Sequence, residues 1–134
     1  MKIKEIEFDI KGDDRGKLIS LENNINIPFE IKRVYYIFNT KNSVRRGFHA
    51  HKNLKQVAVC VKGSCKFLLD DGKEKSTITL NQPNKGLFIE GLIWREMYDF
   101  SDDCVLMVLA DELYYESDYI RDYNEFLKVI NVNN

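Results

Sequence analysis

Residues 56–80, QVAVCVKGSCKFLLDDGKEKSTITL, decide the fold class of this chain. Apolar and β-branched residues fill 56–61, and apolar residues alternate with polar ones in 66–69 and 76–80, which is typical of short strands. The turn signals at 62–63 and 70–73 separate these stretches, and the Asp71-Gly72 pair indicates the tip of a hairpin. This part of the sequence therefore predicts consecutive antiparallel strands.

The same pattern continues on both sides of this stretch. Further strand-like segments occupy residues 6–10, 32–38, 86–89, 93–98 and 104–110, with turn signals at 12–16 and 101–103. We expect about nine or ten short strands, and this many strands with regular turns favour a sandwich or barrel over an alternating strand-helix fold.

The C-terminal segment changes from strand to helical spacing. Beyond Ser117 the apolar positions recur every three or four residues, at Tyr119, Ile120, Tyr123, Phe126, Leu127 and Ile130. Ser117 is a candidate N-cap, and Asp118 suits the first turn of a helix. We expect one helix over residues 117–131, packed on the open end or outer face of the β structure.

Length and composition favour one globular domain over residues 1–134. Of these 134 residues 44% are hydrophobic, and the net charge of −1 gives no field for nucleic acid or an anionic membrane. The longest apolar run, Cys104 to Ala110, has seven residues, whereas a membrane-spanning helix needs about 20. The N-terminal residues contain no hydrophobic segment typical of a secretory signal, so we expect no export.

Three cysteines, Cys60, Cys65 and Cys104, occur without any C-x-x-C spacing. Neither a disulfide framework nor a zinc site is expected from this pattern. We expect reduced cysteines packed in strands, as in a protein of the reducing cytoplasm.

The chain contains two histidines, His49 and His51, within RRGFHAHK at residues 45–52. In a strand this spacing places both imidazoles on one face, because side chains alternate. We also expect Gly47 to leave open space beside His49. Neutral imidazoles take up and return protons near neutral pH, so the pair suits acid–base catalysis.

Two other interpretations of the histidine pair remain open. Paired imidazoles are common ligands of zinc, iron or copper, but a metal site usually needs at least three protein ligands. No third histidine exists, and no carboxylate lies in the four residues after His51, although Glu96 is a candidate from elsewhere in the chain. The second alternative is a pair of solvent-exposed histidines without a function.

Basic and phenolic side chains accompany the histidines. Arg45, Arg46 and Lys52 flank them in the sequence, and Arg33 and Tyr35 lie on a strand that we expect nearby. A base, cations and a phenol together suit an anionic substrate, because guanidinium and ammonium groups bind phosphate.

Trp94 and Arg95 are neighbours in a predicted strand, so they point to opposite faces and only one of them lines the interior. If that residue is Arg95, its charge must meet a carboxylate, a phosphate or a substrate oxygen, because an uncompensated buried charge is unstable.

The stretch Gly47-Phe48-His49-Ala50-His51, followed by Gly63, resembles a degenerate first motif of the cupin superfamily. Gln56 stands where that motif has a glutamate. Residues 91–95, which resemble the second motif, contain no histidine. The resemblance thus implies a cupin that has lost its metal.

A closer resemblance covers nearly the whole chain. Four stretches, residues 27–37, 46–52, 94–97 and 118–121, are similar to the dTDP-4-keto-6-deoxyglucose 3,4-ketoisomerases. This resemblance implies an all-β, cupin-type jelly-roll barrel with one C-terminal helix, no metal or organic cofactor, and a homodimer that exchanges its N-terminal strands, residues 1–22. It also implies a role in making dTDP-linked 3-amino-3,6-dideoxyhexoses for surface glycans such as the lipopolysaccharide O-antigen.

The implied reaction moves a carbonyl from C4 to C3 of the hexose through an enediol. His49 and His51 are expected to share the proton transfers, and which of them removes the carbon-bound proton stays open. Tyr35 is a candidate donor to the developing enediolate. The candidates for substrate binding are Arg33, Arg46, Lys52 and Arg121 toward the diphosphate, and Arg15 and Arg95, at positions that vary in the family, toward the sugar.

Two competing functions are distinguishable by experiment. A related dTDP-sugar epimerase would remove protons next to the keto group without moving the carbonyl. A non-catalytic, sugar-nucleotide-binding cupin would bind the ligand without exchanging its C3 hydrogen with solvent.

Overall fold

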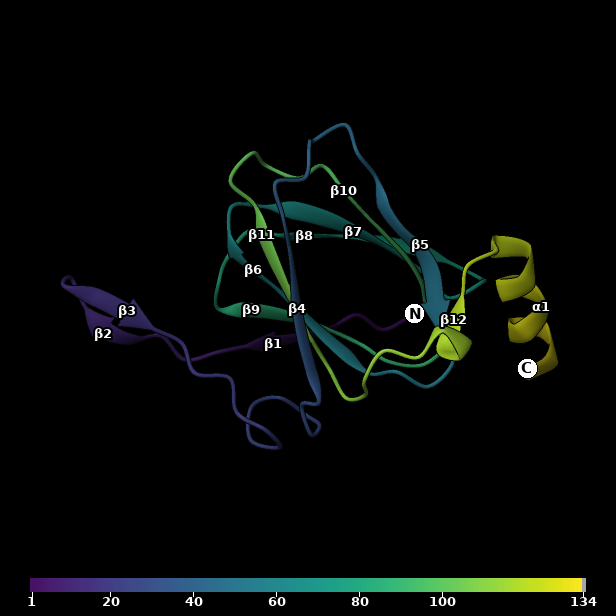
Figure 1. Ribbon diagram of the computed structural model, residues 1–134, viewed down its shortest axis with the longest axis horizontal. Coiled ribbons are helices and arrows are strands. Elements are labelled where there is room, and N and C mark those ends of the chain that lie inside the picture. The colour runs from purple at the N-terminus through teal and green to yellow at the C-terminus, as the bar shows by residue number, and fades with distance from the viewer. Residues whose placement is uncertain (134) are drawn as a thin grey trace.

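The computed structural model describes residues 1–133 and consists mainly of two five-stranded antiparallel sheets (Figure 1). One sheet has the strand order β1-β9-β6-β11-β4, and the other has the order β12-β5-β10-β7-β8. The first sheet comprises β1 (Lys4–Glu7), β9 (Lys85–Ile89), β6 (Gln56–Lys62), β11 (Val105–Ala110) and β4 (Arg33–Phe38). The second comprises β12 (Tyr119–Ile120), β5 (Arg46–His51), β10 (Trp94–Tyr98), β7 (Cys65–Asp70) and β8 (Lys75–Leu80).

The path of the chain between these sheets is that of a jelly roll. Strands β4, β6, β9 and β11 lie in one sheet, and β5, β7, β8 and β10 lie in the other, so the chain crosses repeatedly between two layers. This confirms the prediction of an all-β fold with short antiparallel strands. Over residues 1–133 the two sheets are separate hydrogen-bonded ladders, not one closed barrel.

The core lies between the two layers and is built by alternation along the strands. The largest cluster of buried side chains includes Phe67, Leu87 and Leu106, which come from both sheets. In β4 the side chains of Arg33, Tyr35 and Ile37 are half-buried, whereas those of the intervening residues Val34, Tyr36 and Phe38 are exposed. The period of two thus turns a cation and a phenol of β4 toward the interior.

The C-terminal helix, α1, spans Tyr123–Asn133 and begins six residues later than expected. Residues 116–118 form a 3₁₀ turn, and Tyr119 and Ile120 form β12, which pairs with His51 and Ala50. The true cap is Asp122, whose side chain accepts a hydrogen bond from the Glu125 N–H at 3.0 Å. The helix packs against the outer face of its sheet, as expected (Figure 1).

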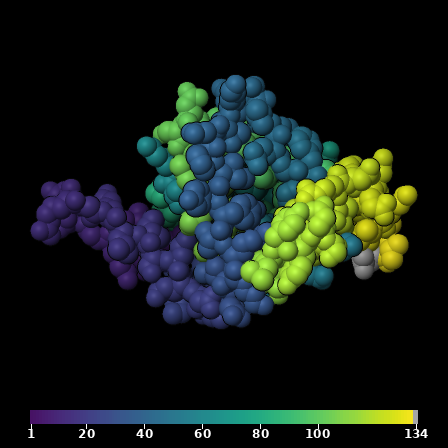
Figure 2. Space-filling model, in the orientation of Figure 1, coloured from purple at the N-terminus to yellow at the C-terminus, as the bar shows by residue number. Residues whose placement is uncertain are grey.

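The short strands β2 (Lys11–Asp13) and β3 (Gly16–Leu18) form a hairpin that extends away from the body of the molecule (Figures 1 and 2). All six residues of its strands are exposed. The preceding strand β1, in contrast, pairs with β9 of the same chain. No helix among the described residues is long and apolar enough to cross a bilayer.

Candidate active site

The two histidines lie side by side on the inward face of β5. Their ring centroids are 4.9 Å apart, and the ring of Tyr119, from the adjacent strand β12, lies 5.1 Å from His49 and 4.4 Å from His51. Ala50, between them, is buried on the opposite face under α1. The expected common face is therefore confirmed, and neither imidazole is solvent-exposed: His49 is half-buried and His51 is buried.

A local irregularity in β5 precedes the histidines. His49 pairs with Arg95 and Gly47 pairs with the next residue, Glu96, so Phe48 is an extra residue in the ladder. Gly47 has a φ of +92°, and a Cβ there would lie 2.8 Å from the Arg95 carbonyl oxygen. The expectation of open space at Gly47 is wrong: the glycine permits close contact between β5 and β10.

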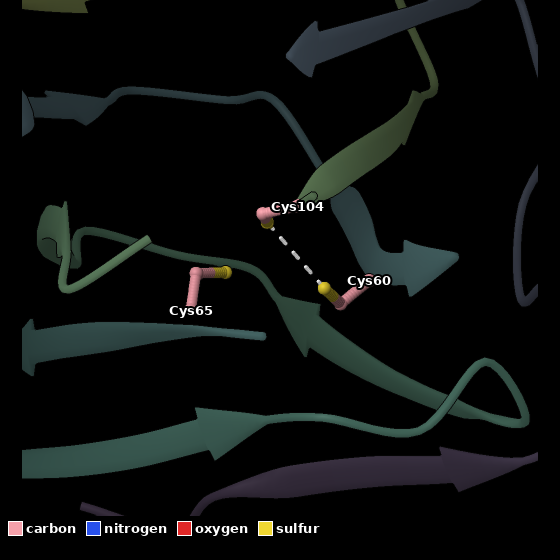
Figure 3. A group of neighbouring side chains, drawn as sticks. All are labelled: Cys60, Cys65 and Cys104. Atoms are coloured by element: carbon pink, nitrogen blue, oxygen red, sulfur yellow. Dashed lines mark hydrogen bonds between the residues drawn. The ribbon is translucent and has the colours of Figure 1, made fainter. Parts of the chain in front are cut away.

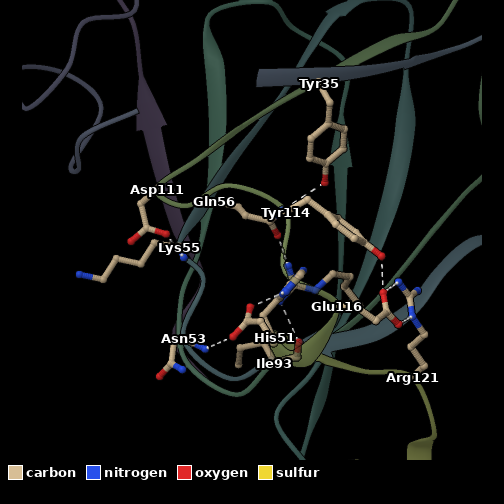
Figure 4. Close-up of polar contacts among 12 residues, drawn as sticks. Tyr35, His51, Asn53, Lys55, Gln56, Ile93, Asp111, Tyr114, Glu116 and Arg121 are labelled. Atoms are coloured by element: carbon tan, nitrogen blue, oxygen red, sulfur yellow. Dashed lines mark hydrogen bonds and ion pairs between the residues drawn. The ribbon is translucent and has the colours of Figure 1, made fainter. Parts of the chain in front are cut away.

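His51 is held in one orientation by Asp118. Its Nδ1 lies 2.9 Å from Asp118 Oδ2, and the other carboxylate oxygen accepts the Asn53 backbone N–H at 2.8 Å. Figure 4 labels the two partners of this carboxylate, His51 and Asn53. Burial, and then the nearby Arg95, lower the pKa of His51 well below its usual range. The contact is therefore a hydrogen bond in which a neutral imidazole donates through Nδ1, and this leaves Nε2 as the basic nitrogen.

Burial also keeps His49 neutral. It lowers the pKa of His49 to about 4, and the positive charge of Arg95 contributes to the decrease. Both imidazoles are thus free bases at neutral pH, which is the form needed to remove a proton from carbon.

Arg95 is a buried charged group beside the histidines, although it lines neither of the two clefts that open at this end of the jelly roll. Its side chain is buried, and its two terminal nitrogens donate to Gln56 Oε1 and, at 3.0 Å, to the Ile93 carbonyl oxygen. Burial lowers its pKa to about 10, so the guanidinium stays charged at neutral pH. The residue that lines the interior is therefore Arg95, and Trp94 packs on the other face against Tyr123 and Phe126 of α1.

Gln56 connects Arg95 to Tyr35. Its amide nitrogen donates to the Tyr35 hydroxyl oxygen at 3.1 Å, while its amide oxygen accepts from Arg95. Burial raises the pKa of Tyr35, so the phenol keeps its proton. The hydroxyl hydrogen of Tyr35 remains available to a further acceptor.

The donor set does not fit a metal ion. The amide of Gln56, at the position where the cupin motif has a glutamate, is bonded to a guanidinium beside the histidines. Glu96, the carboxylate considered for a third ligand, instead accepts from Arg45 at 2.7 Å and from the Trp94 indole at 2.9 Å. A buried positive charge next to the imidazoles opposes a divalent cation.

Two clefts open at this end of the jelly roll. The mouth cleft, of about 280 Å³, is lined by Arg33, Tyr35, Ile37, Arg46, Gly47, His49, Met97, Tyr119 and Arg121. The side cleft, of about 310 Å³, includes His51, Lys52, Asn53 and Asp118, and shares Arg33 and Tyr119 with the mouth cleft. The mouth cleft thus joins a base, a phenol and three guanidinium groups, which suits a phosphorylated ligand.

Arg121 and Arg15, the two other predicted substrate-binding residues, differ in their positions relative to the clefts. Arg121 lies over the Tyr119 ring at 4.2 Å and is bound by both oxygens of Glu116, at 2.7 and 2.9 Å. Arg15 lines neither cleft: it sits at the tip of the β2–β3 hairpin, exposed and paired with Asp13. Within one chain, Arg15 is therefore not part of the site.

Three functional neighbours were not predicted from the sequence. The residue pattern predicts Asp118 as a helix residue and Tyr119 as part of an apolar stripe, both within the stretch 118–121 that carries the family resemblance, and Gln56 as a departure from a glutamate; none of them is predicted as a site residue. Their roles depend on contacts with residues from other parts of the chain.

Three buried nitrogens have no hydrogen-bond partner among the described residues, and all belong to this region: Arg33 Nε, His51 Nε2 and Arg95 Nε. Such groups are typical of a site that a polar ligand completes.

Comparison with known proteins agrees with this geometry. Residues 1–131 match the family model FdtA, described as WxcM-like, C-terminal. A TDP-4-oxo-6-deoxy-alpha-D-glucose-3,4-oxoisomerase from Aneurinibacillus thermoaerophilus is 55% identical over 130 residues, which are 97% of this chain and 94% of that protein.

Two solved structures extend the comparison. A 3,4-ketoisomerase from Helicobacter canadensis is 53% identical, with a TM-score of 0.94 over 98% of both chains. A histidine-to-asparagine variant of the 3,4-ketoisomerase from Thermoanaerobacterium thermosaccharolyticum, in complex with TDP-4-keto-6-deoxyglucose, is 45% identical, with a TM-score of 0.95 over 97% of this chain and 94% of that one.

Proposed function

This chain belongs to the FdtA family and is a dTDP-sugar 3,4-ketoisomerase, and we propose that it moves the keto group of dTDP-4-keto-6-deoxyglucose from C4 to C3 by acid–base catalysis at His49 and His51. The observation that carries the mechanism is the pair of neutral imidazoles beside the buried Arg95. The product is a dTDP-3-keto-6-deoxyhexose.

The steps of this reaction balance without an external oxidant. One imidazole removes the proton on C3, the electron pair forms the C3–C4 double bond, and the C4 oxygen becomes an enediolate oxygen. The C4 oxygen takes up a proton and becomes a hydroxyl, a second proton is returned to C4, and the C3 hydroxyl loses its proton as the C3 carbonyl forms. C3 is oxidised and C4 is reduced within one molecule, and the two histidines together supply and accept the protons.

The negative charge of the enediolate needs a stabilising group. Arg95 is charged and bonded to neutral oxygens only, and the Tyr35 hydroxyl lies in the same hydrogen-bonded chain through Gln56. We assign these two residues to the enediolate, because fixed donors in a water-poor site stabilise developing charge without reorganisation. Asp118 acts as a positioning residue, since it fixes the tautomer of His51.

The diphosphate is assigned to the rim of the site. Arg33, Arg46 and Arg121 line the mouth cleft, and Lys52 lines the adjoining side cleft. Guanidinium groups bind phosphate oxygens with two parallel hydrogen bonds, so this arrangement would hold the nucleotide at the rim and the sugar beside His49.

We also propose that the enzyme is a homodimer and that, of the N-terminal residues 1–22 expected to be exchanged, the β2–β3 hairpin is the part that reaches the partner subunit. Support comes from the extended β2–β3 hairpin and from the exposed apolar side chains Ile10, Leu18, Tyr36 and Phe38, which are 50–63% accessible in the isolated chain. Because β1 pairs within its own sheet, the hairpin is the part available for exchange. It would carry Arg15 to the partner subunit, and sedimentation velocity of wild type and Leu18→Glu tests this assembly.

The proposed compartment is the cytoplasm, on the grounds that the three cysteines are free thiols. The proposed product class is a precursor of 3-amino-3,6-dideoxyhexoses for surface glycans, since a 3-keto group is what an aminotransferase requires at C3.

Proton NMR of dTDP-4-keto-6-deoxyglucose in D₂O tests the activity, with His51→Asn as the control. The proposal requires a 3-keto species and deuterium at C4. Exchange at C3 without carbonyl migration would indicate the related epimerase reaction. Binding of the sugar nucleotide without any exchange would indicate a non-catalytic cupin.

A further inference from the structure

All three cysteines of the chain meet at one point, although Cys104 is about 40 residues from the other two in the sequence. Cys60 lies in β6, Cys65 begins β7, and Cys104 precedes β11. These elements belong to both sheets, so the cluster joins the two layers of the fold. The sequence spacing gave no metal-binding motif because the convergence arises from the strand topology.

The three sulfur atoms lie within 4.8 Å of one another, and Cys60 Sγ is 3.6 Å from Cys104 Sγ (Figure 3). All three residues are at most 3% exposed. The Cys60 thiol also donates to the Lys62 carbonyl oxygen at 3.1 Å, so a backbone oxygen borders the cluster.

These separations are close to those required by thiolate coordination. With metal–sulfur bonds of about 2.3 Å, the sulfurs of a tetrahedral or trigonal site lie about 3.8–4.0 Å apart. The observed sulfurs therefore need to move by about 1 Å or less to bind one ion. Soft sulfur ligands select thiophilic cations, and hard cations such as Mg²⁺ prefer oxygen.

The surroundings offer a route to the cluster. The turn at Lys62 and Gly63 packs against the loop Ser101–Cys104: a Cβ on Gly63 would lie 2.3 Å from Ser101 Oγ and 2.9 Å from the Cys104 Cα. Lys62, Asp102 and Asp103 in these two segments are exposed. Local opening of these surface turns would admit an ion that the strands themselves exclude.

The cluster is separate from the active site. Gln56 and Cys60 are four residues apart on β6, which corresponds to about 13 Å along a strand. In β11 the end nearest Cys104 pairs with Phe38, whereas the other end pairs with Arg33 of the mouth cleft. An ion at the cysteines would thus connect the two sheets at the far end of the jelly roll.

We propose that Cys60, Cys65 and Cys104 bind one thiophilic d¹⁰ divalent cation, of the Zn²⁺ and Cd²⁺ class, as a structural site. Each thiol releases its proton to solvent on coordination, so binding of one ion releases three protons. The Lys62 carbonyl oxygen is the neighbouring donor for a fourth position. Occupancy stabilises the folded chain by mass action and leaves the isomerase reaction unchanged.

Titration of the reduced protein with Cd²⁺ tests this site, because cadmium–thiolate bonds absorb in the ultraviolet. We expect the absorption to saturate at one ion per chain, with release of protons into a weakly buffered solution and an increase in the thermal unfolding midpoint. Absence of thiolate absorption in the wild-type protein would overturn the proposal without any recourse to variants.

Two kinds of variant identify the ligands. Cys60→Ser and Cys104→Ser should each weaken Cd²⁺ binding by at least about tenfold. Even replacement of a residue that only hydrogen-bonds to a metal ligand typically lowers metal affinity by about tenfold or more. The matched control is the double variant His49→Asn/His51→Asn, which removes both imidazoles of the chain, the other side chains that favour such ions. This variant should retain the full cadmium–thiolate absorption. Proton release and thermal stabilisation without thiolate absorption, both lost in the histidine variant, would assign the ion to the active site and overturn the proposal. Cys104→Ala provides a second probe if a serine is not tolerated in the core.

Discussion

Replacement of Asp118 by asparagine is the sharpest test of the mechanism, because it changes one oxygen to nitrogen at the partner of His51. In the native site the carboxylate accepts two donors, His51 Nδ1–H at 2.9 Å and the Asn53 N–H at 2.8 Å. An amide has only one oxygen, so it cannot accept from both. If that oxygen stays on Asn53, the amide NH₂ faces His51 Nδ1 and favours the tautomer with the proton on Nε2.

The size of the effect follows from the alternative placements of this amide. The placement just described removes the base, and the comparable aspartate-to-asparagine change in a Ser-His-Asp triad lowers kcat on the order of 10⁴-fold. The flipped amide keeps the correct tautomer but leaves the Asn53 N–H facing another donor. An unsatisfied donor costs about 1–3 kcal/mol, which lowers the active population about 5- to 150-fold. We therefore expect kcat to fall by at least about fivefold and KM to change little.

The assay is steady-state turnover of dTDP-4-keto-6-deoxyglucose, together with ¹⁵N NMR of the His51 ring, which reports the tautomer directly. Asp122→Asn is the matched control: Asp122 caps α1 through the Glu125 N–H, and asparagine is an equally good cap. A kcat of Asp118→Asn within about threefold of wild type, with Asp122→Asn unaffected, would refute the assignment of Asp118.

Three further predictions concern the histidines and the groups that set their pKa. His49→Asn and His51→Asn should each lower kcat about 10²- to 10⁴-fold with an unchanged circular dichroism spectrum; wild-type rates in both would remove the histidines from the mechanism. The pKa of His49 is about 4 in the folded chain against an ordinary value of 6.5, so its contribution to stability is complete above pH 6.5 and is lost as the pH falls toward 4. The loss from this half-buried residue is at most about 3 kcal/mol, and urea unfolding of wild type and His49→Asn should show a flatter pH profile in the variant. Gln56→Glu should give Arg95 a carboxylate partner, raise the pKa of His49 in an NMR titration and lower kcat, and an unchanged pKa would contradict the role given to the charge of Arg95.

Much of the fold was predictable from local pattern. The strands at 32–38, 56–61, 86–89 and 104–110 coincide with observed strands to within a few residues, because alternation and β-branched residues report a half-buried pleated surface. The same rule placed His49 and His51 on one face correctly. The first strand ends at Glu7, earlier than its alternating pattern suggests.

The start of the C-terminal helix was not predictable in this way. Residues Ser117 to Asp122 carry helical spacing, but Tyr119 pairs with His51 and the Asp118 carboxylate bonds to residues about 65 positions earlier in the chain. These long-range bonds outweigh local propensity, which is worth only about 0.7 kcal/mol or less per residue for ordinary residues. Local spacing of apolar residues cannot predict hydrogen bonds to residues that far away in the sequence.

The same limit explains which site residues the sequence could indicate. Imidazoles and guanidinium groups can be recognised in the sequence as candidate site residues, because their side chains carry acid–base or anion-binding chemistry. Arg33, Arg46 and Arg121 do line the mouth cleft with His49. The importance of Gln56 depends instead on what it faces. A glutamine carries no charge, and only the fold shows that its amide joins Arg95 to Tyr35.

The neutral side chain of Gln56 affects the stability of the fold, the pKa of the two histidines and the chemistry of the site. Burial is the main reason that His49 and His51 are neutral, and the charge of Arg95 adds to it. A carboxylate at position 56 would compensate the buried Arg95, but it would also remove this second contribution. The amide satisfies one guanidinium nitrogen and leaves the charge uncompensated, at a cost in stability that the surrounding core must offset. The positive charge is then available when the substrate becomes an enediolate, so the same guanidinium adds to burial in keeping the imidazoles unprotonated before the reaction and stabilises the intermediate during it.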